Sequence, residues 1–295
     1  MNDLKTYGEV IRNIRTNKGL SQKKLYSGII SKSYAIEFEK GNHDISLRLI
    51  DQILDRLMMD IDEFFYIYRG YKASEHDEFI NNYSEAGNNN DLEGLIKLYH
   101  ELYQKKDESS KIHLAEVRSR IRLLKQFQST FEYEKKVILI EDIETITTYL
   151  NNLQSWTLQE MQLFTNTLDY IVYDEKDVLF KTLIKSIKKY ENYDRGRDVI
   201  CVMLTNMIRE LIMNNEISYA EILNEDLKNI SSQYQSIFFK IECKYYSGLI
   251  KIKRNDKEEG TKLAQSSIDV LHQFDQPHQA KFMESILSQV LQSTT

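Results

Sequence analysis

The sequence predicts an all-α protein with two domains. Its 295 residues, 41% of them hydrophobic, are enough for one small domain of about 60 to 70 residues and a larger one with its own core. One proline and ten glycines are too few for the turns of a β-sandwich or for a glycine-punctuated nucleotide-binding sheet. Apolar residues recur at helical spacing along most of the chain, so helices are expected throughout.

Residues 1–68, here called the head, predict five short helices. Apolar residues recur at helical spacing from position 7 to 14, and Gly19 stands where a left-handed residue would end the first helix. Ser46 is the expected N-cap of a fourth helix, whose apolar face packs beneath the first three, and a fifth begins at Asp62.

The second and third helices of the head carry the most specific pattern. Ser21 is the expected N-cap of a short second helix that Gly28 closes. Ser31 or Lys32 opens the third helix, which ends at Gly41. Two short helices joined by a tight turn form a helix-turn-helix.

The charge of the chain is divided unequally. The first 50 residues hold nine basic and five acidic side chains, so their net charge is +4. Because the whole chain has a net charge of −6, the remaining residues carry a net charge of −10. A basic head on an acidic body is the layout of a protein whose head meets phosphate and whose body stays away from it.

A helix-turn-helix places the start of its second, recognition helix against base edges in the major groove and directs the start of the preceding helix at a phosphate. The base-side candidates are therefore Lys32, Ser33 and Tyr34, within a group from Ser31 to Tyr34 that is expected to face DNA. Gln22 is the expected phosphate or backbone clamp. Further electrostatic contacts are expected from Arg12, Arg15, Lys23 and Lys40. The alternative is that these are ordinary solvated side chains of a helical bundle. Glu37 and Glu39 are expected to be structural or to repel wrong sequences.

The segments GLSQKKL, SKSY, FEKG and LDRLMMDIDEFF, within and just after residues 11–54, resemble a five-helix lambda-repressor-like helix-turn-helix of the Xre class. They are most similar to that of the Rgg/GadR/MutR transcription regulators, and LYSGIISKS also resembles the related PrgX-like pheromone receptors. The resemblance implies a homodimer that binds double-stranded promoter DNA through its heads. It also implies a C-terminal helical repeat that binds a short signalling peptide in quorum sensing. Some members are cross-linked through a head cysteine, which this head lacks, so a dimer would be non-covalent.

Beyond an expected linker at 69–76, residues 77–295 form what is here called the body. Six polar breaks separate its helical runs, and pairs of helices recur at about 35 to 40 residues, close to the tetratricopeptide period, although the consensus residues of that repeat are not convincing. These breaks lie at 87–91, 105–110, 151–157, 191–196, 254–260 and 274–277. A tetratricopeptide-like α-superhelix with a concave face suited to an extended peptide is expected. The final helix, 280–291, would either cap this superhelix or join the dimer.

Asn206 is the first candidate for the concave face, because an asparagine amide can hydrogen-bond a peptide backbone in both directions. Asn166, Tyr170 and Tyr173 are spaced to line the same groove, and Arg209 would pair with an acidic group of the ligand. The alternatives are that Asn206 bonds a neighbouring helix or water, that the tyrosines belong to the core, and that Arg209 is solvated.

No residue pattern in the sequence supports catalysis, a metal or a cofactor. The six histidines are scattered, and GxSxG, P-loop and GxGxxG motifs are absent from the sequence. Cys201 and Cys243 have no CxxC partner, which fits a reducing compartment. The N-terminus does not resemble a signal peptide, and no run of about 18 apolar residues occurs. A cytoplasmic, non-enzymatic regulator without membrane spans is expected. The alternative function is a DNA-tethered scaffold whose body binds a partner protein.

Overall fold

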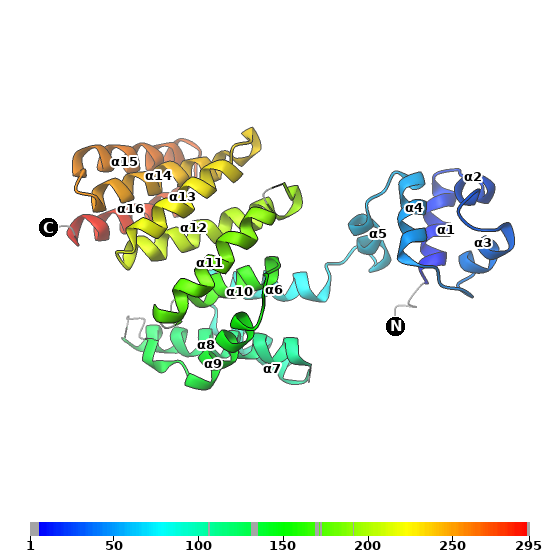
Figure 1. Cartoon of the computed structure of the whole chain (residues 1–295), viewed down its shortest axis with the longest axis horizontal. Helices are drawn as coiled ribbons and strands as arrows, with labels where there is room; N and C mark the ends of the chain where they lie inside the picture. Colours follow the sequence, from blue (N-terminus) through cyan, green and yellow to red (C-terminus); the bar gives the residue numbers. More distant parts are fainter. Residues whose placement is uncertain are drawn as a thin grey trace. The chain divides into compact units, whose positions relative to one another are not determined.

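The computed structural model describes residues 6–105, 107–130, 135–168, 171, 173–190 and 192–293 (Figure 1). Within these ranges the chain is helical and contains no β-strand, which confirms the all-α expectation. The chain divides into two compact units, Met1–Gly94 and Leu95–Thr295. We keep the names head and body for the sequence ranges defined above and describe each by itself.

The first unit contains six helices and the start of a seventh. The helices are α1 (Tyr7–Asn17), α2 (Gln22–Tyr26), α3 (Lys32–Glu39), α4 (Leu47–Leu57), α5 (Ile61–Tyr68) and α6 (Glu75–Asn88). The first five form the head, whose buried core takes side chains from each of them, including Ile11, Leu25, Phe38, Ile53 and Phe64.

Side-chain caps fix where the head helices begin. Thr6 and Glu9 form a capping box at α1, and Ser21 accepts a hydrogen bond from the backbone of Lys24 at α2. Ser46 does stand at the N-cap position of α4, but its side chain makes no capping hydrogen bond. Between α1 and α2 the chain turns at Gly19, whose φ of +65° is a conformation that favours glycine.

Ten further helices lie in the described residues from position 92 onward. These are α7 (Leu92–Tyr103), α8 (Glu108–Thr130), α9 (Ile140–Asn151), α10 (Leu158–Thr167), α11 (Tyr173–Lys189), α12 (Arg197–Met213), α13 (Ile217–Ile230), α14 (Ile237–Lys253), α15 (Lys257–Gln273) and α16 (Pro277–Gln292). Short 3₁₀ helices occur at Lys135–Val137, Asp194–Gly196 and Tyr234–Ser236. Each of the six predicted polar breaks overlaps a gap between two helices.

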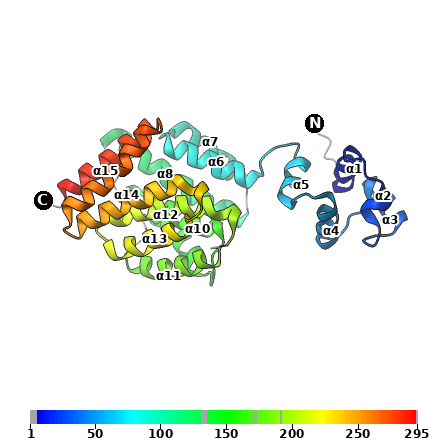
Figure 2. The ribbon, with the colours of Figure 1, turned by 90° about the horizontal axis from the view of Figure 1, so that it is seen from above.

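The C-terminal helices of the body pack as a layered stack. Each helix from α12 to α16 contacts the next, and α14 also contacts both α12 and α16 (Figures 1 and 2). Alternate helices therefore form a row of their own, as in helical-hairpin repeats. Helices α14 and α15 approach each other closely, because a Cβ atom on Gly248 would lie 2.7 Å from the carbonyl oxygen of Gly260.

No helix in the described ranges is both long and apolar enough to cross a membrane. Among the same residues, histidine, cysteine, aspartate and glutamate side chains do not gather into groups that could hold a metal ion.

Candidate nucleic-acid interface and ligand face

The start of α3 presents polar side chains to solvent. Ser31 caps the helix by accepting a hydrogen bond from the backbone N–H of Tyr34 at 3.2 Å, and its hydroxyl lies 3.2 Å from that of Ser33. Ser31, Lys32 and Ser33 are exposed, and Tyr34 is 38% exposed. The cap thus fixes the first turn of α3, while the side chains on that turn stay accessible to a ligand.

Tyr34 is held in place by the loop that follows α3. Its hydroxyl donates a hydrogen bond to the carbonyl oxygen of Asp44 at 2.8 Å, and its ring stacks on His43 with centroids 5.3 Å apart. His43 is exposed and therefore joins the same surface. His43 was not among the predicted DNA-facing residues, because its contact with Tyr34 depends on how the loop folds back.

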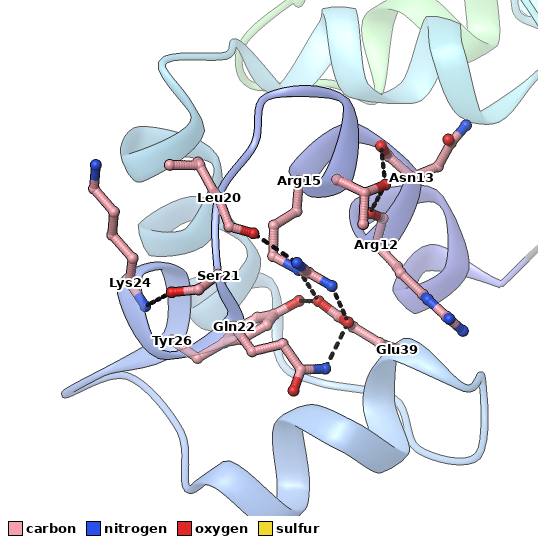
Figure 3. A network of polar contacts seen from close by, with 10 residues as sticks. Arg12, Asn13, Arg15, Leu20, Ser21, Gln22, Lys24, Tyr26 and Glu39 are labelled. Carbon is pink, nitrogen blue, oxygen red and sulfur yellow. Dashed lines mark hydrogen bonds and ion pairs between the residues drawn. The ribbon is translucent and has the colours of Figure 1, made fainter.

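Behind this surface, Glu39 ties α1, α2 and α3 together (Figure 3). Its carboxylate is 2% exposed and accepts two hydrogen bonds from Arg15, from Nε at 2.6 Å and from Nη2 at 2.8 Å. Gln22 Nε2 donates to the same carboxylate at 2.7 Å, and the Tyr26 hydroxyl donates at 2.8 Å. Arg15 Nη1 donates in addition to the carbonyl oxygen of Leu20 at 2.6 Å.

These contacts keep the buried pair charged at neutral pH. Burial by itself disfavours the Glu39 carboxylate, but hydrogen bonds from Arg15, Gln22 and Tyr26 outweigh burial and hold the pKa of Glu39 below its ordinary range. The hydrogen bond to Glu39 likewise raises the pKa of Arg15. For Tyr26, burial and then the same carboxylate raise the pKa, so its hydroxyl remains a donor.

The network changes the assignment of two candidates. Arg15 is 9% exposed, and its guanidinium contacts Glu39 and Leu20, so it supports the interior of the head and we remove it from the set of phosphate-facing side chains. The expectation that Arg15 makes an electrostatic contact with DNA is corrected by its burial. Gln22 stays at the surface in part, but its amide nitrogen is oriented by Glu39.

The other basic candidates lie on the outside of the head. Arg12, Lys23 and Lys32 are exposed, and Figure 3 shows Arg12 extending away from the Glu39 network. Lys40 is exposed as well, but its ammonium lies 2.7 Å from Glu37, which partly neutralises it.

A depression of about 320 Å³ lies between α2 and α3 and is lined by Gln22, Lys23 and Lys32, among others. The fold therefore brings the phosphate candidates of α2 next to the base candidate at the start of α3.

In the body, α12 carries a row of exposed side chains opposite its buried face. Successive helical residues are rotated by about 100°, so the spacing of three and four residues puts the members of this row on one side. The row, here called the α12 stripe, consists of Val199, Val202, Asn206, Arg209 and Met213. The valines and Met213 are 36%, 49% and 41% exposed, respectively, and Asn206 is half-buried between them. The two polar members were predicted from the sequence, whereas the apolar ones were not, because valine and methionine are ordinary residues of a helical core.

The guanidinium of Arg209 contacts two neighbouring side chains. Its guanidinium carbon lies 5.5 Å from the ring centroid of Phe282 on α16, a cation–π distance, and its Nε lies 3.7 Å from Glu210. Phe282 is itself 42% exposed, so it extends the accessible surface from α12 to α16.

The remaining groove candidates behave differently. Asn166 donates a hydrogen bond from Nδ2 to the buried carboxylate of Glu116 at 2.8 Å. Its amide group therefore binds a neighbouring helix. Tyr170 lies outside the described residues, and so does the side chain of Tyr173.

A family model for the C-terminal domain of the HTH-type transcriptional regulator Rgg matches residues 96–285, which is more than half of the chain. The chain belongs to the Rgg family. Its family-matched region includes the whole α12 stripe and α14. Members of this family are transcription regulators rather than enzymes.

Solved structures of similar fold extend the likeness over nearly the whole Rgg-family chain. A Listeria monocytogenes EGD-e protein described as a transcriptional regulator is 36% identical, with a TM-score of 0.89 and 97% of each chain covered. The pheromone receptor Rgg2 of Streptococcus dysgalactiae, a receptor for the SHP pheromone, is 18% identical, with a TM-score of 0.77 and coverage of 95% of this chain and 98% of that one. The PrgX/cCF10 complex is 17% identical, with a TM-score of 0.70 and coverage of 96% and 98%.

Proposed function

We propose that this Rgg-family regulator reads promoter DNA in a sequence-specific manner through its head and binds a short signalling peptide through its body. The observation that carries the DNA part is the capped, solvent-facing start of α3, with Lys32, Ser33 and Tyr34 exposed on one turn. The peptide part is supported by the similar folds of an SHP pheromone receptor and of the PrgX/cCF10 complex.

At the DNA, the first turn of α3 enters the major groove. Lys32 and Ser33 offer hydrogen-bond donors to base edges, and the ring of Tyr34 offers an apolar edge to a thymine methyl group. Lys23, Arg12 and the N-terminus of α2 contact phosphate, which positions the head without reading sequence. The Glu39 network stabilises this arrangement, because it sets the angle between α2 and α3.

We also propose that the protein acts as a homodimer, so that two heads meet two half-sites about one helical turn apart. The two cysteines of the chain, Cys201 and Cys243, are both buried in the body and neither lies in the head. A dimer of this chain is therefore held together without a disulfide between heads.

The α12 stripe is the proposed contact surface for the peptide. Val199, Val202 and Met213 leave apolar area accessible that an apolar ligand side chain can cover, and this area lies on both sides of Asn206. The Asn206 amide can donate to and accept from the backbone of an extended peptide. Peptide binding then shifts the equilibrium between two arrangements of the heads in the dimer. The size of this shift is set by the difference in the affinity of the peptide for the two arrangements.

The experiment that tests the DNA part is selection of bound duplexes from a random pool by the full-length protein. At about 0.15 M salt, non-specific phosphate binding is weakened, so enrichment reports base reading. We expect an inverted repeat whose half-sites are about 10 base pairs apart, centre to centre. Failure to enrich any sequence, both alone and with a pool of short peptides added, would contradict the proposal.

A further inference from the structure

Four carboxylates are buried in the described part of the chain, and one of them lacks a strong partner. Glu39 is bound by Arg15, Asp142 by Arg118, and Glu116 by His113 and Asn166. Glu242 on α14 is 5% exposed, and a single neutral group, the amide of Gln279 on α16, donates to its Oε1 at 3.2 Å. Among the described residues, none donates a hydrogen bond to its Oε2.

A buried carboxylate with one neutral donor is destabilising, since most of its hydration has been removed without replacement. Burial raises the pKa of Glu242 to about 7, while Arg209 and the hydrogen bond from Gln279 oppose this only in part. Replacing a buried charge by an apolar residue of similar volume is often neutral or stabilising. A further hydrogen-bond donor would therefore stabilise the charged form of the Glu242 carboxylate.

Glu242 lies beside the α12 stripe. Arg209 of the stripe is close enough to act on the Glu242 charge but makes no hydrogen bond to it, because its guanidinium is turned to Phe282 and Glu210. Phe282 lies one turn from Gln279 on α16. Three helices, α12, α14 and α16, thus surround one acceptor at the edge of an accessible, partly aromatic surface.

We propose that Glu242 is the counter-ion for a cationic group of the bound peptide, either its terminal ammonium or a lysine or arginine side chain. The ligand would supply the charged donor that the protein withholds, and the exposed face of Phe282 would cover the cation. This inference rests on the proposed peptide function and adds the class of ligand that the α12 stripe selects.

The test starts from peptides that the protein chooses. Full-length protein is panned against random heptapeptides with free amino termini. Each recovered sequence is then synthesised in four forms, combining a free or acetylated terminus with cationic side chains retained or replaced by neutral ones. Affinities are measured for the wild type, for Glu242→Gln, which keeps the side-chain shape, and for Glu210→Gln as a control for general electrostatics. Fluorescence of the buried Trp156 verifies that each variant body is folded.

We expect that removal of one of the two kinds of cation weakens binding to the wild type and to Glu210→Gln about tenfold or more, the size typical of a charged hydrogen bond. The same removal should leave binding to Glu242→Gln unchanged. Which of the two neutral forms loses affinity identifies the source of the cation. If the neutral forms bind the wild type equally well, this inference is wrong while peptide sensing stands. If no peptide is recovered, peptide sensing itself is wrong and the inference falls with it.

A pH series provides a second readout. With a lysine-bearing peptide, affinity for the wild type should rise from pH 6 to pH 8 as Glu242 loses its proton, and affinity for Glu242→Gln should stay flat. Of the neighbouring groups, Tyr245 and Tyr246 stay neutral over this range because burial raises their pKa values. Glu210 is exchanged separately in the control. An equal pH dependence in Glu242→Gln would overturn the assignment.

Discussion

Glu39 is the residue on which the geometry of the head depends most. Exchange to Gln keeps its size but leaves the buried guanidinium of Arg15 without a counter-charge, and breaking a buried ion pair costs about 3 kcal/mol. We expect faster amide hydrogen exchange across residues 7–40 of Glu39→Gln. The matched control is Glu37→Gln on the same helix, whose exposed pair with Lys40 should contribute little. Equal protection in the two variants would show that the Glu39 network does not hold α2 against α3.

The same residue predicts acid sensitivity of the head. The folded pKa of Glu39 is held below its ordinary value of 4.5, so its contribution to stability is present above that pH. The contribution is lost as the pH falls through the lower, folded value. Hydrogen exchange measured between pH 6 and pH 3 should therefore show the head of the wild type losing protection, with a smaller loss in Glu39→Gln.

Glu242 predicts the opposite trend for the body. Its folded pKa is raised from 4.5 to about 7, so it binds a proton more tightly when folded, and the body loses stability as the pH rises from 4.5 through 7. The full shift corresponds to an upper limit of about 3 kcal/mol. Urea unfolding followed by Trp156 fluorescence should show that Glu242→Gln is more stable than the wild type at pH 8. A Glu242→Gln variant no more stable than the wild type at pH 8 would mean that the carboxylate already has its donors.

At the scale of elements, the contact between α14 and α15 depends on glycines that face each other. A Cβ atom on Gly248 would lie 2.7 Å from the Gly260 oxygen and from the Ala264 nitrogen, so the two helices would have to separate. In an open helix, Gly→Ala stabilises by about 0.4–1 kcal/mol, whereas overpacking costs about 1–3 kcal/mol. The sign of the change in stability therefore distinguishes the two cases. Gly248→Ala should lower the urea midpoint measured by Trp156 fluorescence, and a raised midpoint would refute the close contact.

Local signals explain which elements could be predicted from the sequence. The starts of α2 and α3 were found because Ser21 and Ser31 cap helices through bonds that span only three residues. The turns at Asn214–Glu216 and at residues 231–236 were not among the six predicted breaks, although both are polar. Helical propensity and periodicity therefore predicted the positions of the helices better than the number of helices.

Contacts between distant parts of the chain explain what could not be predicted. Arg15 meets Glu39 across 24 positions and Asn166 meets Glu116 across 50, so neither partner can be read from helical spacing. Arg15 and Asn166 were both predicted to contact a ligand, but their side chains bind other residues of the protein. Conversely, Val199 and Val202 were not among the predicted site residues, and the packing of α12 leaves them exposed. Of the predicted candidates, Lys32 and Ser33 are exposed, and Asn206 and Arg209 are half-buried.

At the scale of the whole molecule, the central claim is that the exposed start of α3 reads base sequence. The most direct test is equilibrium binding of a selected duplex and a scrambled duplex at about 0.15 M salt, by the wild type and by a variant with Lys32, Ser33 and Tyr34 all exchanged for alanine. We expect the wild type to prefer the selected duplex by about 10³-fold or more, and the variant to bind the two duplexes alike while its head retains its hydrogen-exchange protection. A variant that keeps the preference of the wild type would contradict the claim and move the reading surface elsewhere on the protein.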